Sequence, residues 1–262
     1  MRTPRWILLA LLASGYALAL GQGSLTLASL PAFALLLSSA WLVRAGHARR
    51  WRILGHGLFV LTAVALALHR LPGFDNARVI DAVRLSADAI PFSLSLNLDK
   101  PLIGFWLLLA CPWIVMIPRP RPRIAALAAL LSGVTCLGAA WLSGVVDGAL
   151  KWPPQAWLWA ANNLLLVSLV EEALFRGYLQ GGLQRLLAPW PHADNLALAL
   201  AATLFGLAHV GGGWPWVALA TLAGVGYGLA WRHGGLPAAV LAHFGLNLAH
   251  FALFTYPLKA IP

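Results

Sequence analysis

Two adjacent glutamates, Glu171 and Glu172, and an arginine one turn later, Arg176, interrupt an apolar stretch of the chain. A charged carboxylate in the hydrocarbon of a bilayer costs at least ~2.5 kcal/mol on insertion scales. The chain has only eight acidic residues, so two of them side by side in an apolar stretch indicate chemistry or transport. Glu172 and Arg176 are four residues apart and are expected to pair on one helix face. Glu171 then points about 100° away, into a different environment.

Two histidines and an asparagine are the other polar groups in apolar helices. They are His209, which ends the segment Phe205-GLA-His209, and the pair His243 and Asn247, four residues apart. Burial raises the proton affinity of a carboxylate, as a general base near neutral pH requires. Taken singly, each group has a structural explanation, such as an ion pair between helices or a histidine at a helix C-terminus. One arginine cannot neutralise two carboxylates, so an ion pair alone does not explain both glutamates. Burying all these groups separately would be costly, so together they favour one polar cavity.

The composition places these groups in a membrane protein. Hydrophobic residues make up 60% of the chain and charged residues 10%, whereas soluble domains average about 25% charged residues. Apolar runs approaching the ~20 residues of a membrane-spanning helix recur along the chain. We therefore predict an all-α, polytopic integral membrane protein with eight or nine transmembrane helices. The net charge of +10 lies in connectors between the apolar runs, where basic residues set topology, so no nucleic-acid partner is expected.

The apolar runs predict the following helices, of which the first could also be read as a signal peptide and is expected to be retained. They are Trp6–Leu20, Ser24–Val43, Ile53–Leu68, Leu102–Ile117, Ile124–Val146, a run from Ala156 or Asn163 through the glutamates, Leu196–His209, Trp216–Trp231 and Leu236–Phe254. A polar loop at 70–100 separates the third and fourth, and Val79–Ala89 within it has the spacing of a short amphipathic surface helix. We divide the chain into residues 1–150, to which no motif is assigned, and a transmembrane catalytic region at 151–262.

The distribution of basic residues predicts the orientation. With the N-terminus in the cytoplasm, 12 of the 18 basic residues, Arg2 and Arg119 among them, lie in inner segments, as the positive-inside rule requires. The excess of arginine over lysine is compatible with a bacterial inner membrane. A sixth helix that began at Ala156 and crossed directly would place Glu171 far from the level of His209. A helix over Asn163–Leu183, bending at Gly177, Gly181 and Gly182, removes this difficulty.

Three spaced motifs resemble those of a known family. In chain order they are Glu171-Glu172-x-x-x-Arg176, Phe205-x-x-x-His209 and His243-x-x-x-Asn247. They resemble the motifs of the CPBP family, also called Abi, which comprises CAAX-processing endopeptidases and bacteriocin-processing or immunity proteins. The similarity extends over about residues 156–256. Segment 95–104 is also similar to CPBP members associated with C-terminal protein sorting.

The resemblance implies an intramembrane endopeptidase acting on a membrane-anchored protein or propeptide, with a C-terminal sorting or processing substrate as one candidate. Glu171 would activate water and His209 would help to hold it. His243 and Asn247 would stabilise the oxyanion. Glu172, Arg176 and Phe205 would support the site.

Three alternatives remain open. A zinc-dependent version of the protease would use Glu171, His209 and His243 as ligands. We favour the metal-free glutamate mechanism, because the sequence contains no H-E-x-x-H segment and a ligating Glu171 would be a poorer base. A transporter could use the buried residues as a relay, but no paired inverted repeat is visible. A non-catalytic immunity protein would be expected to have lost motif residues, and all of them are present.

Overall fold

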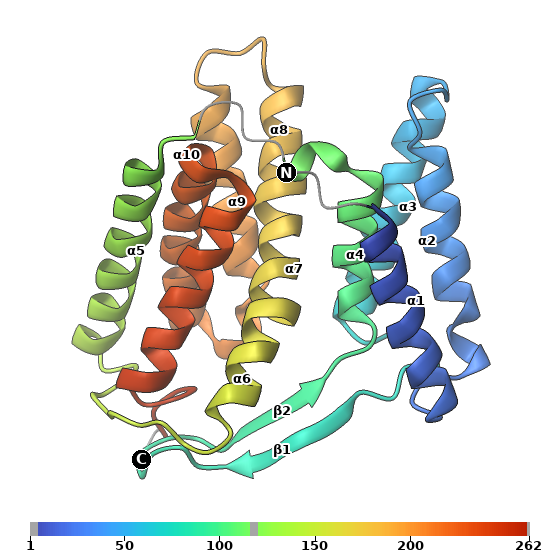
Figure 1. The fold of residues 1–262 in the computed structure, drawn as a ribbon. Helices are drawn as coiled ribbons and strands as arrows, with labels where there is room; N and C mark the ends of the chain where they lie inside the picture. Colours follow the sequence, from blue (N-terminus) through green and yellow to red (C-terminus); the bar gives the residue numbers. More distant parts are fainter. Residues whose placement is uncertain (1–4, 116–119, 261–262) are drawn as a thin grey trace. The chain divides into compact units, whose positions relative to one another are not determined.

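The computed structural model describes residues 5–115 and 120–260, which form helices and one two-stranded sheet (Figure 1). Contacts divide the chain into two compact units. The N-terminal unit runs to Arg78 and includes Ser95–Pro112, whereas the C-terminal unit comprises Val79–Leu94 and the chain from Trp113 onward.

Four helices form the N-terminal unit. They are α1 (Arg5–Gly21), α2 (Leu30–Leu42, preceded by a 3-10 turn at Leu27–Ser29), α3 (Arg49–Ala67) and α4 (Lys100–Ala110). A glycine in α3, Gly55, lets α2 and α3 pack closely, because a Cβ there would lie 2.7 Å from Cβ of Leu42. The rings of Phe59 and Trp106 stack at 3.7 Å and join α3 to α4.

A buried aspartate ties this unit together at the start of α4. Asp99 is 1% exposed and accepts the backbone N–H of Lys100 at 2.8 Å, which caps the helix. The same carboxylate lies 2.5 Å from Nδ1 of His69 and 3.4 Å from the amide of Asn76. The segment 95–104, which the sequence associated with sorting systems, therefore has a structural role in the N-terminal unit.

The loop at 70–100 contains two strands, β1 (Ala77–Val83) and β2 (Phe92–Leu96), which pair with each other. The predicted amphipathic helix over Val79–Ala89 is therefore wrong. The β-branched side chains of this segment fit a pleated surface. Pairing with β2 also satisfies backbone groups that a short, isolated helix would leave to solvent.

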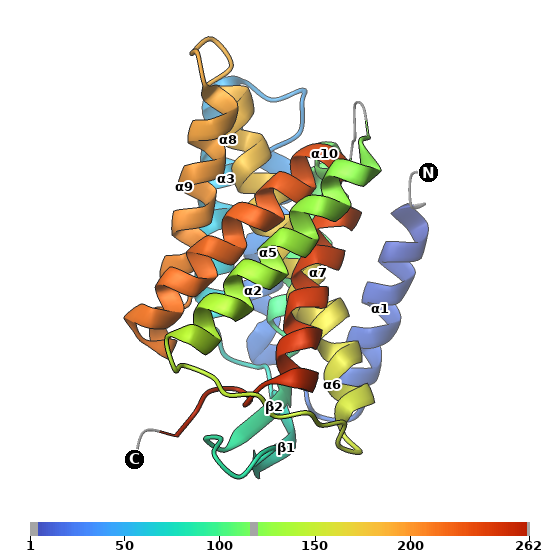
Figure 2. The ribbon, with the colours of Figure 1, turned by 90° about the vertical axis from the view of Figure 1, so that its left-hand side faces the viewer.

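The C-terminal unit contains the longest helices. They are α5 (Pro122–Leu142); a continuous helical run over Ala156–Leu186, made of α6 (Ala156–Asn162), α7 (Leu169–Glu172) and α8 (Gly181–Leu186) with two π-helical segments at Asn163–Ser168 and Ala173–Gln180; α9 (Ala193–Leu207); and α10 (Trp214–Leu253). Helix α10 packs against both α5 and α9. Within it, Gly235 has φ 69° and ψ −164° and breaks the helix. Figure 2 shows that the second half of α10 turns back along the first. The predicted eighth and ninth helices are thus both present, with a single glycine between them.

The predicted bend at Gly177, Gly181 and Gly182 is wrong, because the helix continues to Leu186. Two of these glycines are instead points of close packing. A Cβ on Gly177 would lie 2.7 Å from Cβ of Ile114, and one on Gly181 would lie 3.2 Å from the ring of Trp231.

The helices support the prediction of an integral membrane protein. Four described helices are long and apolar enough to cross a bilayer: α3, α5, the run Ala156–Leu186 and α10. Each predicted apolar run is helical over most of its length, but the total of eight or nine spans stays a prediction. The predicted Leu102–Ile117 span is shorter than expected, since α4 ends at Ala110 and a 3-10 turn follows at Pro112–Val115. Ile117, Arg2 and Arg119 lie outside the described residues, and the orientation also stays a prediction.

Candidate active site

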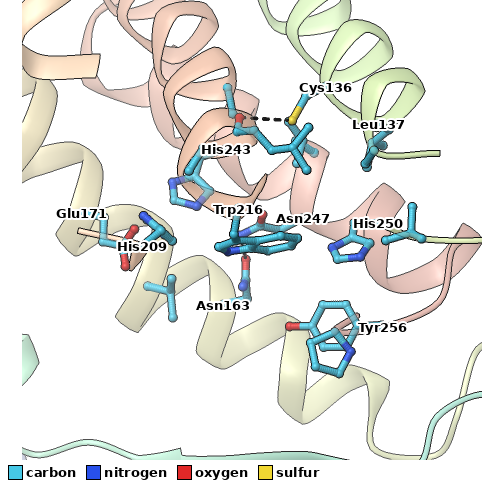
Figure 3. A pocket seen from close by; sticks show the side chains of 18 of the residues that line it. Cys136, Leu137, Asn163, Glu171, His209, Trp216, His243, Asn247, His250 and Tyr256 are labelled. Atoms are coloured by element: carbon cyan, nitrogen blue, oxygen red, sulfur yellow. Dashed lines mark hydrogen bonds between the residues drawn. The ribbon is translucent and has the colours of Figure 1, made fainter. Parts of the chain in front are cut away.

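The C-terminal unit encloses a cavity of about 300 Å³ (Figure 3). The helical run Ala156–Leu186, α5, α9, both halves of α10, β2 and the C-terminal segment all contribute to its wall. The four residues expected to be catalytic, Glu171, His209, His243 and Asn247, all line this cavity. The structure therefore gathers them at one place, and their chemical roles stay predictions.

A π-helical segment sets the direction of Glu171. Trp159, Asn163, Val167 and Glu171 follow one another at intervals of four and line the same cavity. In a regular α-helix of 3.6 residues per turn, such a series rotates steadily away from one face. The wider turn of a π-helix, with its i→i+5 hydrogen bonds, compensates for this rotation between residues 163 and 168. The preferred start of this helix at Asn163 is wrong, because the helix runs from Ala156 to Leu186 and Glu171 lies midway along it.

The two adjacent glutamates have different environments. Glu172 is fully buried; its Oε2 accepts from Nε of Arg176 at 3.0 Å, and its Oε1 lies 2.9 Å from Nδ1 of His243. The expected pairing of Glu172 with Arg176 is thus present, and His243 is an additional partner. Oε2 of Glu171 is buried and has no hydrogen-bond partner among the described residues. One carboxylate is thus engaged on both sides, while the other lines the cavity and has a buried oxygen without a partner in the described chain.

The ring of Phe205 supports three polar residues of the site. The guanidinium carbon of Arg176 lies 5.0 Å from its centroid, a cation–π contact. The rings of His209 and His243 lie 4.6 Å and 5.7 Å from it. Gly224 leaves room for the arginine, because a Cβ there would lie 3.2 Å from Nη2 of Arg176. These contacts explain why a phenylalanine belongs to the second motif.

Both histidines are held through Nδ1. Nδ1 of His209 lies 2.8 Å from the backbone oxygen of Phe205, and a carbonyl can only accept, so Nδ1 carries the hydrogen. Nδ1 of His243 is engaged by Glu172, and its ring stacks on Tyr227 at 4.7 Å and 12°. The Nε2 atom of each ring remains for a ligand in the cavity.

An asparagine that the sequence reasoning missed contacts Asn247. Oδ1 of Asn163 accepts from Nδ2 of Asn247 at 3.3 Å and from Oγ of Ser168 at 3.3 Å. The available signal was its position eight residues before Glu171. A pattern based on regular α-helix turns would have placed it on another face, which is why it was overlooked.

The C-terminal segment closes one end of the cavity, where Tyr256 and His250 line the wall. Nε2 of His250 lies 3.1 Å from the backbone oxygen of Thr255, and the Thr255 hydroxyl donates to Asp88 at 2.6 Å. That hydrogen bond is the main cause of a pKa of Asp88 below the ordinary 3.8.

Burial raises the pKa of Tyr256 to about 12, so its hydroxyl stays neutral and accepts from Nε1 of Trp159 at 3.0 Å.

Glu171, His209 and His243 are the side chains that a metal ion in this cavity would need as ligands. Histidines whose Nδ1 is tied to a carboxylate or carbonyl are typical of metal sites. However, no group of three or more His, Cys, Asp or Glu side chains able to hold a metal ion occurs within residues 5–115 and 120–260. Glu171, His209 and His243 do not form such a group in this structure, so their placement does not fit a zinc ion.

Comparison with protein families agrees with this geometry. Residues 152–249 match the family model described as type II CAAX prenyl endopeptidase Rce1-like. This region is Rce1-like. It contains all three motifs, so the resemblance to the CPBP and CAAX protease family is confirmed. The match implies protease activity, and with the apolar helices it supports an integral membrane protein. Comparison with curated proteins and with solved structures finds no match.

Proposed function

We propose that this protein is an intramembrane endopeptidase that hydrolyses a peptide bond of a membrane-anchored protein or propeptide with water activated by Glu171. The observation that carries the proposal is the contrast between the two glutamates. Glu172 is held by Arg176 and His243, whereas a buried oxygen of Glu171 has no partner in the described chain. A general base needs a carboxylate that is not held by other groups and that borders the site of the water, and Glu171 lines the cavity.

The reaction begins at Glu171 and His209. A water molecule gives a proton to the Glu171 carboxylate while its oxygen attacks the substrate carbonyl carbon. Nε2 of His209 lacks a hydrogen when Nδ1 carries it, so it accepts the second hydrogen of this water and orients it. Glu171 then returns the proton to the amide nitrogen as the C–N bond breaks.

The negative charge that develops on the carbonyl oxygen is met by His243 and Asn247. Nδ1 of His243 is held by Glu172, which leaves Nε2 for the oxyanion, and a hydrogen on Nε2 would donate to it. The NH₂ group of Asn247 supplies a second donor. Such fixed donors act chiefly in the transition state.

The cavity wall fits an apolar substrate segment. Leu137, Val146, Trp216 and Leu219 form much of its surface beside the polar residues. The matching family is named for prenylated CAAX substrates, and a C-terminal processing substrate is our proposal for this chain. We further propose a bacterial inner membrane location with a cytoplasmic N-terminus, from the distribution of arginines.

Two experiments test the function. The termini of membrane proteins are compared by proteomics between cells with the wild-type protein and cells with Glu171→Gln. In parallel, the purified proteins are given a reporter, a quenched fluorescent peptide that either ends in a prenylated CAAX sequence or spans a cleavage site found in the cells. We expect new termini and reporter cleavage with the wild type only. Identical termini and no cleavage by the wild type would reject an endopeptidase and leave the transporter or immunity protein, whereas equal cleavage by both proteins would reject Glu171 as the base.

A further inference from the structure

An asparagine side chain can stabilise an oxyanion only if its NH₂ group, and not its C=O group, faces the substrate. We propose that Asn163 is the positioning residue that fixes this orientation of Asn247. The proposal rests on the proposed endopeptidase function.

In the structure the amide of Asn163 is turned with its oxygen toward both Asn247 and Ser168. Asn163 is 7% exposed and opens the first π-helical segment. Its Oδ1 accepts two hydrogen bonds of 3.3 Å, one from Asn247 and one from the hydroxyl of the fully buried Ser168. An amide oxygen has two lone pairs, so both are used. Reversing the amide of Asn247 would bring two carbonyl oxygens together and lose the bond between the residues.

The remaining hydrogen of Asn247 then has a defined direction. An NH₂ group carries two hydrogens, and the bond to Asn163 uses one of them. The other is left for the cavity, which both asparagines line (Figure 3). A donor held in this way needs no reorientation as charge develops, and such preorganisation is the source of oxyanion stabilisation.

The same contact links the two halves of the catalytic group. Asn163 lies on the helical run that carries Glu171, and the π-helical turn places both on the cavity side. Asn247 lies on the second half of α10, together with His243. The bond between the asparagines therefore holds the proposed base and the proposed oxyanion donors at a fixed separation.

A purely structural contact between two helices is the competing explanation. Such a contact would contribute modestly to the stability of the fold. Losing it would lower the melting temperature but would not change the turnover of the molecules that stay folded. A positioning role instead lowers kcat at nearly constant KM, because the interaction matters in the transition state.

The chain offers a matched control. Asn162 is 8% exposed, lines the same cavity, and has a side-chain oxygen with no partner in the described part of the chain. The experiment measures kcat, KM and melting temperature on the reporter for Asn163→Leu, Ser168→Ala and Asn162→Leu, each alone and combined with Asn247→Ala.

We expect Asn163→Leu to lower kcat by up to about 10²-fold, the effect of a slightly misplaced catalytic group. Ser168→Ala should change kcat in the same direction but less. In the Asn247→Ala background Asn163→Leu should have almost no further effect, because the donor that it orients is already missing. Asn162→Leu should act independently of Asn247, so its effect should be the same in both backgrounds.

Additive effects of Asn163→Leu and Asn247→Ala, or a loss of stability without a loss of kcat, would overturn the proposal. If Asn163→Leu does not fold, Ser168→Ala decides, and an unchanged kcat in that variant rejects the positioning role. No reporter cleavage by the wild type would reject the endopeptidase function itself, and the positioning role with it, whereas full cleavage by Glu171→Gln would reject Glu171 as the base. Loss of cleavage in Glu171→Gln together with additivity at Asn163 rejects only the positioning role.

Discussion

The two neighbouring glutamates should respond in opposite ways to the same isosteric change. Glu172→Gln replaces an acceptor oxygen by NH₂, so one of the bonds to Arg176 and His243 is lost and the buried arginine loses its paired carboxylate. Removing one partner of a buried ion pair costs about 3–5 kcal/mol. At ~2–4 °C per kcal/mol for a protein of comparable size, the melting temperature should fall by roughly 6–20 °C.

Glu171→Gln should leave stability unchanged or slightly raised, because it removes a charge whose buried oxygen has no partner within the described residues. Its turnover should nevertheless fall by at least about 10²–10⁴-fold, the usual contribution of a general base. The assay is thermal unfolding of both purified variants in detergent, followed by reporter cleavage at a temperature where both are folded. Equal shifts in melting temperature, or a stable Glu172→Gln, would refute the assignment of different roles.

Further changes test other parts of the structure. Asn247→Ala should lower kcat by about 10²–10³-fold with little change in KM, as steady-state kinetics on the reporter can show. A chelator should leave the purified enzyme active; loss of cleavage that zinc restores would replace the glutamate mechanism with a zinc-dependent one. Gly177→Ala places a Cβ 2.7 Å from the nearest side-chain carbon and should cost roughly 1–3 kcal/mol, whereas Gly182→Ala, with nothing within 4 Å, should not destabilise. Because the pKa of Asp88 is lowered in the folded protein, its contribution to stability is present above the ordinary pKa of 3.8 and is lost as the pH falls through the lowered value. The wild type should therefore melt above Asp88→Asn at pH 5–7, and this difference should vanish in stronger acid.

The sequence predicts well whatever depends on local pattern. Apolar runs identify helices because a bilayer-spanning or buried helix needs a continuous apolar stretch. The three motifs were found because buried charges are costly and therefore stand out in such runs. The pairing of Glu172 with Arg176 followed from a spacing of four residues within one helix.

Features that depend on distant partners were missed. His243 lies 71 residues from Glu172 in sequence, and no local spacing indicates that they bond. Segment 77–83 has helical apolar spacing, but its pairing with β2 makes it a strand. Gly177 could mark either a bend or a close contact, and only the position of Ile114 decides between them.

The π-helical segment over Asn163–Ser168 should also change how this helix responds to the deletion of a residue. In a regular helix such as α9, deleting one residue turns everything beyond it by about 100°. A π-helical segment already contains a surplus residue relative to an α-helix, so a deletion there can be absorbed by a return to regular turns. The side chains on both sides of the deletion would keep their orientation around the helix axis, and Glu171 would still be directed at the cavity. The helix that carries the proposed base should thus tolerate the loss of one residue at a position where a regular helix would not.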